Sequence, residues 1–215
     1  LQAVFDRAGL PRKMLPAFLV TLALLAFSLW ALPQLPDKVA THWGLDGQPD
    51  GWSSARFGAL LLPGVMVLMS ALFAVLPNID PLKKNYAFHG SVYFLFANVI
   101  VAFMGVVHLL VLGSALGWPV DMRRVLPILI GALFVFIGRL LPRIQPNWFM
   151  GIRTPWTLSS EQVWRKTHVV GATCFTAAGV GIMLIGLFAP GGMATKLMLA
   201  AILLGAEPAA AIVIG

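Results

Sequence analysis

Six long apolar runs dominate this sequence and restrict the chain to folds that a lipid bilayer permits. A helix that crosses the hydrocarbon core needs about 20 apolar residues. The runs lie at residues 14–32, 57–76, 88–114, 125–141, 169–188 and 193–214. Only 11% of the residues are charged, which is too few to cover the surface of a soluble domain. The sequence therefore predicts an all-α, polytopic integral membrane protein: one transmembrane domain, 1–215, with about six helices.

The distribution of Lys and Arg predicts the orientation, because basic residues flanking membrane spans concentrate on the cytoplasmic side. Nine of them precede the first run or lie between runs two and three or four and five, against five on the alternate side. Both termini are therefore expected in the cytoplasm (N-in/C-in). The connection 33–56 is then extracytoplasmic and the connection 142–168 cytoplasmic, although Arg123 and Arg124 oppose this orientation.

Several function classes are disfavoured by composition and motifs. The single cysteine, Cys174, cannot form an internal disulfide or a Cys-rich zinc site. The sequence contains no HExxH or GxSxG pattern, so we predict no catalytic residue, no cofactor and no enzymatic activity. The net charge of +7 is explained by basic residues that flank helices, so no direct nucleic-acid binding is expected.

The connection 33–56 is rich in Pro, Gly and Asp, which predicts a series of turns rather than a helix. It also contains His42, Trp43 and Asp50. A His with carboxylates could bind a metal ion, but two Asp-Gly dipeptides are typical of turns and Trp is typical of a membrane interface. We therefore predict no metal site.

The connection 142–168 contains the signals of a helix start. Ser159 and Gln162 have the spacing of a capping box, which predicts a helix that begins there and continues into the fifth apolar run. Glu161, Trp164 and His168 then lie on one face of that helix, with Glu161 placed to pair with the cation four positions later. His168 can donate a hydrogen bond to a carbonyl or carboxylate.

Before that helix, an extended stretch carries Arg153. Its guanidinium has five donors in a planar fork, which can tie loop carbonyls together or hold an acidic group. The alternative is that the Trp, Arg and Lys side chains of this connection only anchor the chain at the lipid headgroups.

Three polar residues lie inside apolar runs, where burial is costly and polar side chains often serve function. Asn98 and His108 lie in the third run, and Glu207 precedes Pro208 in the sixth. Pro208 is expected to weaken the helix beside Glu207. Glu207 is either part of a functional pathway or hydrated near the interface, and the sequence leaves both open.

Two segments carry a family resemblance. LPDKVATHWGLDGQPDGWSS at 35–54 and RIQPNWFMGIRTPWTLSSEQVWRKTH at 143–168 resemble the signatures LP-x-x-V-x-x-HW-x-x-x-G-x-PD-x-W and PN-x-x-x-GIRTPWTL-x-x-x-x-VW-x-x-TH. These are signatures of the SdpI family of bacterial membrane proteins. The number of helices and the order of the two loops also fit that family.

The resemblance implies an immunity and signalling protein of the bacterial cytoplasmic (inner) membrane. Its partners would be membrane lipids, a secreted peptide toxin or amphiphile, and a cytoplasmic repressor held at the membrane. The alternatives are a small transporter or lipid-handling protein that uses Glu207 and His108, and an intramembrane enzyme. The candidate ligand- or partner-binding residues are His42, Trp43, Asp50, Asn147, Arg153, Thr154, Trp156, Trp164, His168 and Glu207.

Overall fold

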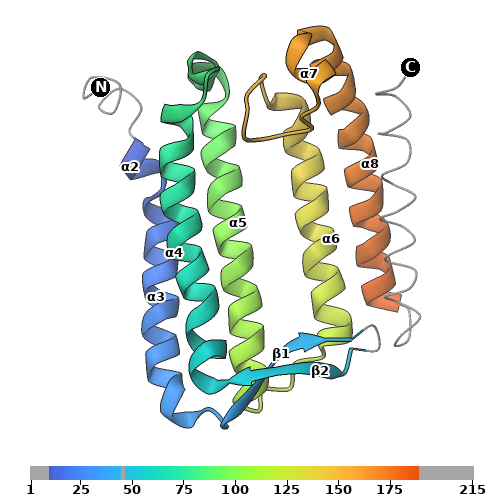
Figure 1. Ribbon diagram of the computed structural model, residues 1–215. Helices are drawn as coiled ribbons and strands as arrows, with labels where there is room; N and C mark the ends of the chain where they lie inside the picture. The colour runs from blue at the N-terminus through green and yellow to red at the C-terminus, as the bar shows by residue number, and fades with distance from the viewer. Residues whose placement is uncertain (1–9, 45–46, 189–215) are drawn as a thin grey trace. The chain divides into compact units, whose positions relative to one another are not determined.

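The computed structural model describes residues 10–44 and 47–188 (Figure 1). Within these ranges, five helices are long and apolar enough to cross a membrane. They are α3 (Leu15–Ala31), α4 (Ala55–Ile79), α5 (Tyr86–Ala115), α6 (Met122–Leu140) and α8 (Glu161–Phe188). The prediction of an all-α multi-pass membrane protein is confirmed, and these helices match the first five apolar runs. The sixth run, with Glu207 and Pro208, lies outside the described residues.

The remaining elements are short. They are the helices α2 (Leu10–Lys13) and α7 (Pro155–Ser159), the 3-10 turns η1 (Leu32–Gln34), η2 (Lys83–Asn85) and η3 (Leu141–Arg143), and the strands β1 (Lys38–Trp43) and β2 (Pro49–Ser54). The chain forms two compact units, described separately. Of the described residues, the α3–α4 unit contains 10–42, 49–79 and 94–120, and the α6–α8 unit contains 43–44, 47–48, 80–93 and 121–188.

Asn98 caps a neighbouring helix in the α3–α4 unit. The first backbone N–H groups of a helix have no partner within the helix. At the start of α3, Ala17 N–H donates to the side-chain oxygen of Asn98 at 2.9 Å. The Asn98 NH₂ group in turn donates to the carbonyls of Lys13 (2.8 Å) and Phe94 (2.7 Å). This polar residue of the third run therefore joins α5 to the start of α3.

His108 makes a second polar contact between α5 and α3. The Ser28 hydroxyl donates to the Leu24 carbonyl at 2.8 Å, so its oxygen is left to accept from His108 Nε2, which lies 2.6 Å away. Both side chains are fully buried. The hydroxyl and Nε2 therefore satisfy each other, as buried polar groups generally require, whereas His108 Nδ1 has no partner among the described residues.

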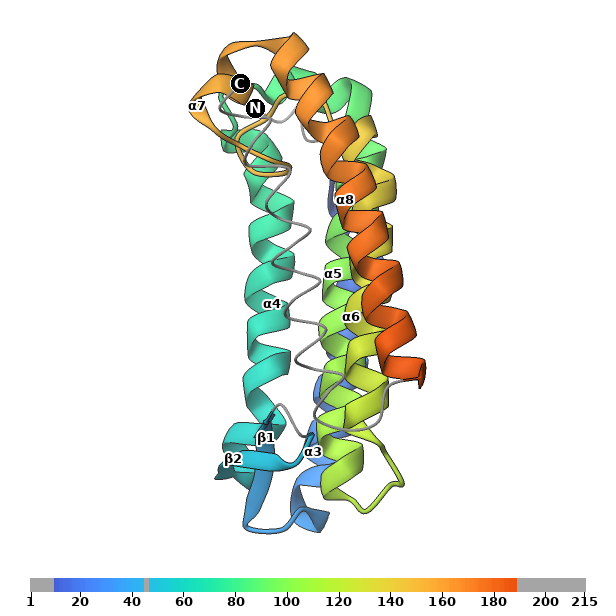
Figure 2. The ribbon, with the colours of Figure 1, turned by 90° about the vertical axis from the view of Figure 1, so that its right-hand side faces the viewer.

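In the other unit, α6 and α8 lie side by side over most of their length (Figures 1 and 2). Their backbones touch at glycines. A Cβ atom at Gly131 would lie 2.5 Å from the carbonyl oxygen of Gly179, and one at Gly179 would lie 2.6 Å from that of Gly131. Small residues allow this close approach, which supports helix association within a membrane.

The connection 33–56 folds as a β-hairpin, which the sequence prediction of turns alone did not include. Strands β1 and β2 form a two-stranded sheet, and Gly44 N–H donates to Gln48 O at 2.9 Å in the turn. The Asp50-Gly51 dipeptide, interpreted as a turn, lies within β2. Gly51 faces His42 closely, since a Cβ at Gly51 would lie 2.7 Å from the His42 Cβ. Cross-strand pairing therefore overrides the local turn preference.

Candidate functional site: the hairpin and the signature loop

The segment between α6 and α8, here called the signature loop (residues 144–160), is organised around the buried side chain of Asn147. Its amide oxygen accepts from the N–H groups of Phe149 (2.9 Å) and Met150 (2.6 Å). Its NH₂ group donates to the carbonyls of Gln145 (2.9 Å) and Met150 (3.0 Å). The bonding capacity of the amide is thus used within the loop, and Asn147 acts as a scaffold residue.

The carboxylate of Asp80, which lies outside the signature loop, binds the loop backbone. Asp80, only 2% exposed, follows α4 directly. One of its oxygens accepts from Leu82 N–H at 2.7 Å, and the other accepts from the Tyr86 hydroxyl and from Trp148 N–H, both at 3.0 Å. Three donors compensate the buried charge, as burial of a carboxylate requires. Asp80 therefore fixes the loop to the turn between α4 and α5.

Sequence reasoning missed Asp80 and its neighbour Asn85, whose NH₂ group donates to the Pro146 carbonyl at 2.7 Å. A local signal was present for Asp80: an Asp before a Pro at the end of an apolar run is typical of a side-chain-capped turn. The contact with Trp148 had no such signal, because that partner lies 68 positions away in the chain.

Trp164 and His168 hold the other side of the signature loop from α8. Both are buried, and their rings stack with centroids 4.1 Å apart. Trp164 Nε1 donates to the Ile144 carbonyl at 2.8 Å. Ile152 N–H donates to His168 Nε2 at 3.1 Å, so this nitrogen carries no proton, and Nδ1 is left to donate to the Trp164 carbonyl at 2.8 Å. The expected carbonyl partner of His168 is thus present.

Position 151 requires a glycine, both because of its backbone conformation and because of the limited space around it. Its φ angle is +106°, a region that side chains disfavour. A Cβ at this position would lie 2.4 Å from His168 Nε2, where Ile152 N–H now binds. The glycine that opens the GIRTPW segment therefore lets the backbone reach the imidazole.

Arg153 is exposed and donates through Nη1 to the Trp148 carbonyl. This is the carbonyl-tying role expected for its guanidinium. Glu161 is also exposed, but no ion pair joins it to Arg165 among the residues that the structure describes. The expected helical pair is therefore not formed.

The predicted capping box at Ser159 and Gln162 is wrong. The capping box instead opens α7: Thr157 N–H donates to Thr154 Oγ1 at 3.2 Å, and Thr154 N–H donates to Thr157 Oγ1 at 2.8 Å. Pro155 fits the first position of this short helix. Ser159 ends α7, and the extended Ser160 precedes α8, accepting from Val163 N–H at 3.4 Å.

The candidate residues of the loop thus fall into two groups. Asn147, Thr154, Trp164 and His168 form internal hydrogen bonds and build the scaffold. Arg153 and the ring of Trp156 are exposed and are presented by it. Only the second group is free to contact a partner directly. Glu207 lies outside the described residues.

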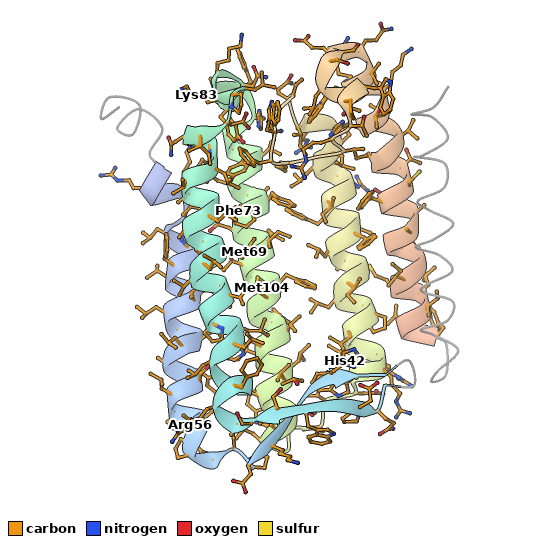
Figure 3. All side chains as sticks on the ribbon, viewed as in Figure 1. His42, Arg56, Met69, Phe73, Lys83 and Met104 are labelled. Carbon is orange, nitrogen blue, oxygen red and sulfur yellow. The ribbon has the colours of Figure 1, made fainter. Side chains whose placement is uncertain are left out.

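On the hairpin, the side chains of His42 and Asp50 form a cross-strand hydrogen bond, and both are exposed. His42 is labelled in Figure 3. Trp43 is half-buried, whereas Trp52 is exposed. Within the described ranges, no group of three or more His, Cys, Asp or Glu side chains could hold a metal ion. The hairpin thus presents an exposed aromatic ring, that of Trp52, two positions after Asp50.

The comparisons with known proteins agree with these two elements. The family model described as the SdpI/YfhL protein family matches residues 143–215, and a domain of unknown function (DUF1648) matches residues 19–67. The immunity protein SdpI of Bacillus subtilis (strain 168) is 25% identical over 154 residues, 72% of each chain. No solved structure matches the chain significantly. Together with the signature residues of both loops, these matches support an SdpI-family assignment.

Proposed function

We propose that this multi-pass membrane protein is an immunity protein of the bacterial cytoplasmic membrane. It protects its host against a secreted peptide toxin or amphiphile and signals to a cytoplasmic repressor. The observation that carries the proposal is the signature loop: its interior bonds are satisfied by buried side chains, and it presents Arg153 and Trp156 on a fixed frame. The similarity to a relative named an immunity protein supports the role.

The hairpin is the proposed toxin contact. The exposed Trp52 ring offers an apolar surface, and the His42–Asp50 pair of the same hairpin offers an imidazole and a carboxylate. Secreted toxins that act on membranes are amphiphilic, so a site of this mixed character fits them. In chain order, the three helices α4, α5 and α6 separate the hairpin from the signature loop. If each crosses the bilayer, the hairpin and the loop face opposite sides.

The signature loop is the proposed repressor contact. Arg153 uses one of its donors on the Trp148 carbonyl, and the remaining donors can take a carboxylate of the repressor. Trp156 adds an exposed aromatic ring, the type of side chain that dominates protein interfaces. A ligand on the hairpin can influence the repressor only if it binds one arrangement of the intervening helices better than another.

Survival of toxin-challenged cells tests the proposal. Cells without their own immunity gene would express this chain and be exposed to the toxin to which the Bacillus subtilis relative gives immunity. We expect wild type to protect and Trp52→Ala to protect at least about tenfold less, the effect of losing one aromatic contact. Trp30→Ala is the matched control, because Trp30 is equally exposed but lies on α3. Equal amounts of each variant in the membrane must be verified by immunoblot.

A small transporter or lipid-handling protein is the second candidate. One observation favours it: His108 Nδ1 is buried and has no hydrogen-bond partner among the described residues. An unsatisfied nitrogen inside a membrane helix is a suitable contact for a passing polar group. Uptake or lipid-exchange assays on His108→Phe would test this role. A variant that loses transport but keeps immunity would separate the two functions.

A further inference from the structure

The end of the α6–α8 unit that carries the signature loop also carries an unbalanced positive charge. Besides the exposed Arg139 in the last turn of α6, six exposed cations lie there, here called the basic rim: Lys83, Lys84, Arg143, Arg153, Arg165 and Lys166. Of the two acidic residues that the structure describes at this end, Asp80 is buried and bound by three donors, and Glu161 is exposed. The six rim cations and this one carboxylate together carry a charge of +5, to which the exposed Arg139 adds one more.

None of the six cations forms an ion pair within the part of the chain that the structure describes. The opposite end of α6 differs in this respect. Arg123 and Arg124 lie 3.4 Å and 3.6 Å from the carboxylate oxygens of Asp121, which balances part of their charge. The positive charge of the rim is therefore not neutralised within the described part of its own unit, and a partner with negative charge would neutralise it.

Exposed aromatic and aliphatic side chains lie directly beside the cations. Phe88 is 81% exposed, one helical turn after Lys84, and Val169 is 56% exposed, one turn after Arg165. Trp148 and Trp156, which are 51% and 60% exposed, lie on the signature loop between them in sequence. Cations adjacent to exposed apolar side chains at helix ends are typical of the headgroup layer of a bilayer.

We propose that the basic rim binds the phosphate groups of anionic phospholipids. Lipid is favoured over a soluble acidic protein because the exposed surface of α5 and α8 becomes apolar within one turn of the cations, at Phe88 and Val169. A soluble partner would have to cover these apolar side chains with its own surface, whereas lipid acyl chains already surround a helix that lies in a bilayer. Asp80 and Asn147 fix the loop that carries part of the rim. This inference does not depend on the immunity role.

Lipid selectivity of the purified full chain tests the proposal. The chain would be reconstituted in phosphatidylcholine bilayers that contain a trace of spin-labelled phosphatidylglycerol or spin-labelled phosphatidylcholine. Electron spin resonance then measures the fraction of label immobilised by the protein. We expect phosphatidylglycerol to associate about fivefold more strongly, which corresponds to roughly one well-placed cation. The preference should fall as salt rises from about 0.05 to 0.5 M, because exposed charges are screened.

The variant Lys83→Gln/Lys84→Gln/Arg165→Gln/Lys166→Gln should reduce the preference well below the wild-type value. It leaves Arg153 and the buried scaffold unchanged. Arg123→Gln/Arg124→Gln is the matched control and should keep the preference, since these cations are paired with Asp121.

If the quadruple variant does not fold, Lys83→Gln/Lys84→Gln should give a partial loss. Equal association of both lipids with wild type, or an undiminished preference in the variants, would overturn the proposal. Equal lipid association together with rim-dependent binding of a soluble acidic protein would assign the rim to a protein partner and would also overturn it.

Discussion

Asp80 and Trp148 are 68 positions apart, yet the carboxylate of the first accepts the backbone N–H of the second at 3.0 Å. The bond joins the turn after α4 to the signature loop, and the same carboxylate also binds Leu82 N–H and the Tyr86 hydroxyl. One side chain therefore holds three separate segments in place. Its removal should affect the loop without any change in the loop's own sequence.

Asp80→Asn should lower the free energy of unfolding by about 1–3 kcal/mol, because an amide NH₂ group would face donors that now bind a carboxylate. The signature loop should also become more sensitive to protease. Thermal unfolding in detergent and limited proteolysis would measure these effects. Asp37→Asn is the control, since Asp37 is exposed beside the hairpin. An Asp80 variant as stable as the Asp37 variant would contradict the role of the carboxylate.

Gly151→Ala should destabilise the chain more than Gly117→Ala. Both glycines have positive φ angles, +106° and +84°, so both variants carry backbone strain of about 1 kcal/mol or more. Among the described residues, a Cβ at Gly117 meets no atom within 4 Å, whereas one at Gly151 meets His168 Nε2. The difference between their melting temperatures isolates the lost contact of Ile152 N–H with the imidazole. Equal melting temperatures would show that the imidazole contact contributes little.

Asn98→Ala should cost about 1–3 kcal/mol, because the start of α3 would lose the acceptor for Ala17 N–H and two carbonyls would lose their donor. Asn78→Ala is the matched control: its NH₂ group makes a single bond to a carbonyl within its own helix, that of Ala74. Thermal unfolding of both variants in the same detergent would give the comparison. A larger loss for Asn78→Ala would contradict the capping role.

Arg153→Lys should leave the melting temperature within a few degrees of wild type and still reduce repressor recruitment about tenfold. Lysine can keep one hydrogen bond to the Trp148 carbonyl but lacks the planar fork needed to bind a carboxylate with two bonds. The fraction of repressor that sediments with membranes is the measurement. Arg143→Lys, also exposed, serves as the control. Unchanged recruitment in Arg153→Lys would exclude the bidentate role.

The orientation of the chain remains a prediction from its Lys and Arg distribution. In a Cys174→Ser background, a cysteine at Gln48 should react with an impermeant thiol reagent added to intact cells, whereas one at Ser159 should react only after lysis. Both positions are exposed in the structure, so access by the reagent is decided by the membrane alone. Equal labelling of the two in intact cells would contradict opposite faces for the hairpin and the loop.

The helices were predictable from sequence because hydropathy is a property of each segment by itself. Runs of apolar residues predicted α3, α4, α5, α6 and α8, and the structure has all of them. The hairpin was not predicted, since Asp50 and Gly51 have local turn preferences and join β2 only through cross-strand pairing. Local preference is a weak guide wherever tertiary partners decide.

The residues of the candidate site also divide into those that local sequence signals identified and those that depend on long-range contacts. Arg153 and His168 were identified from motif and helical spacing, and both have the polar contacts expected of them. The cap was misplaced because Ser159 and Thr154 both precede suitable helix starts, and only the Thr154–Thr157 contacts distinguish them. Asp80 was missed because its key partner is distant in sequence. Side chains with partners nearby in the chain can be predicted, whereas long-range anchors need the fold.

The glycine contact between Gly131 and Gly179 has a consequence for how the signature loop forms. The loop starts where α6 ends and finishes where α8 begins, so pairing of these helices brings its two ends together. The association of the helices then offsets the conformational entropy that is lost when the loop closes. The hydrogen bonds within the loop need only stabilise one conformation of a segment whose ends already lie close together. Substituting either glycine should therefore disturb the distant signature loop, by separating the two ends that the hydrogen bond from Trp164 to the Ile144 carbonyl joins.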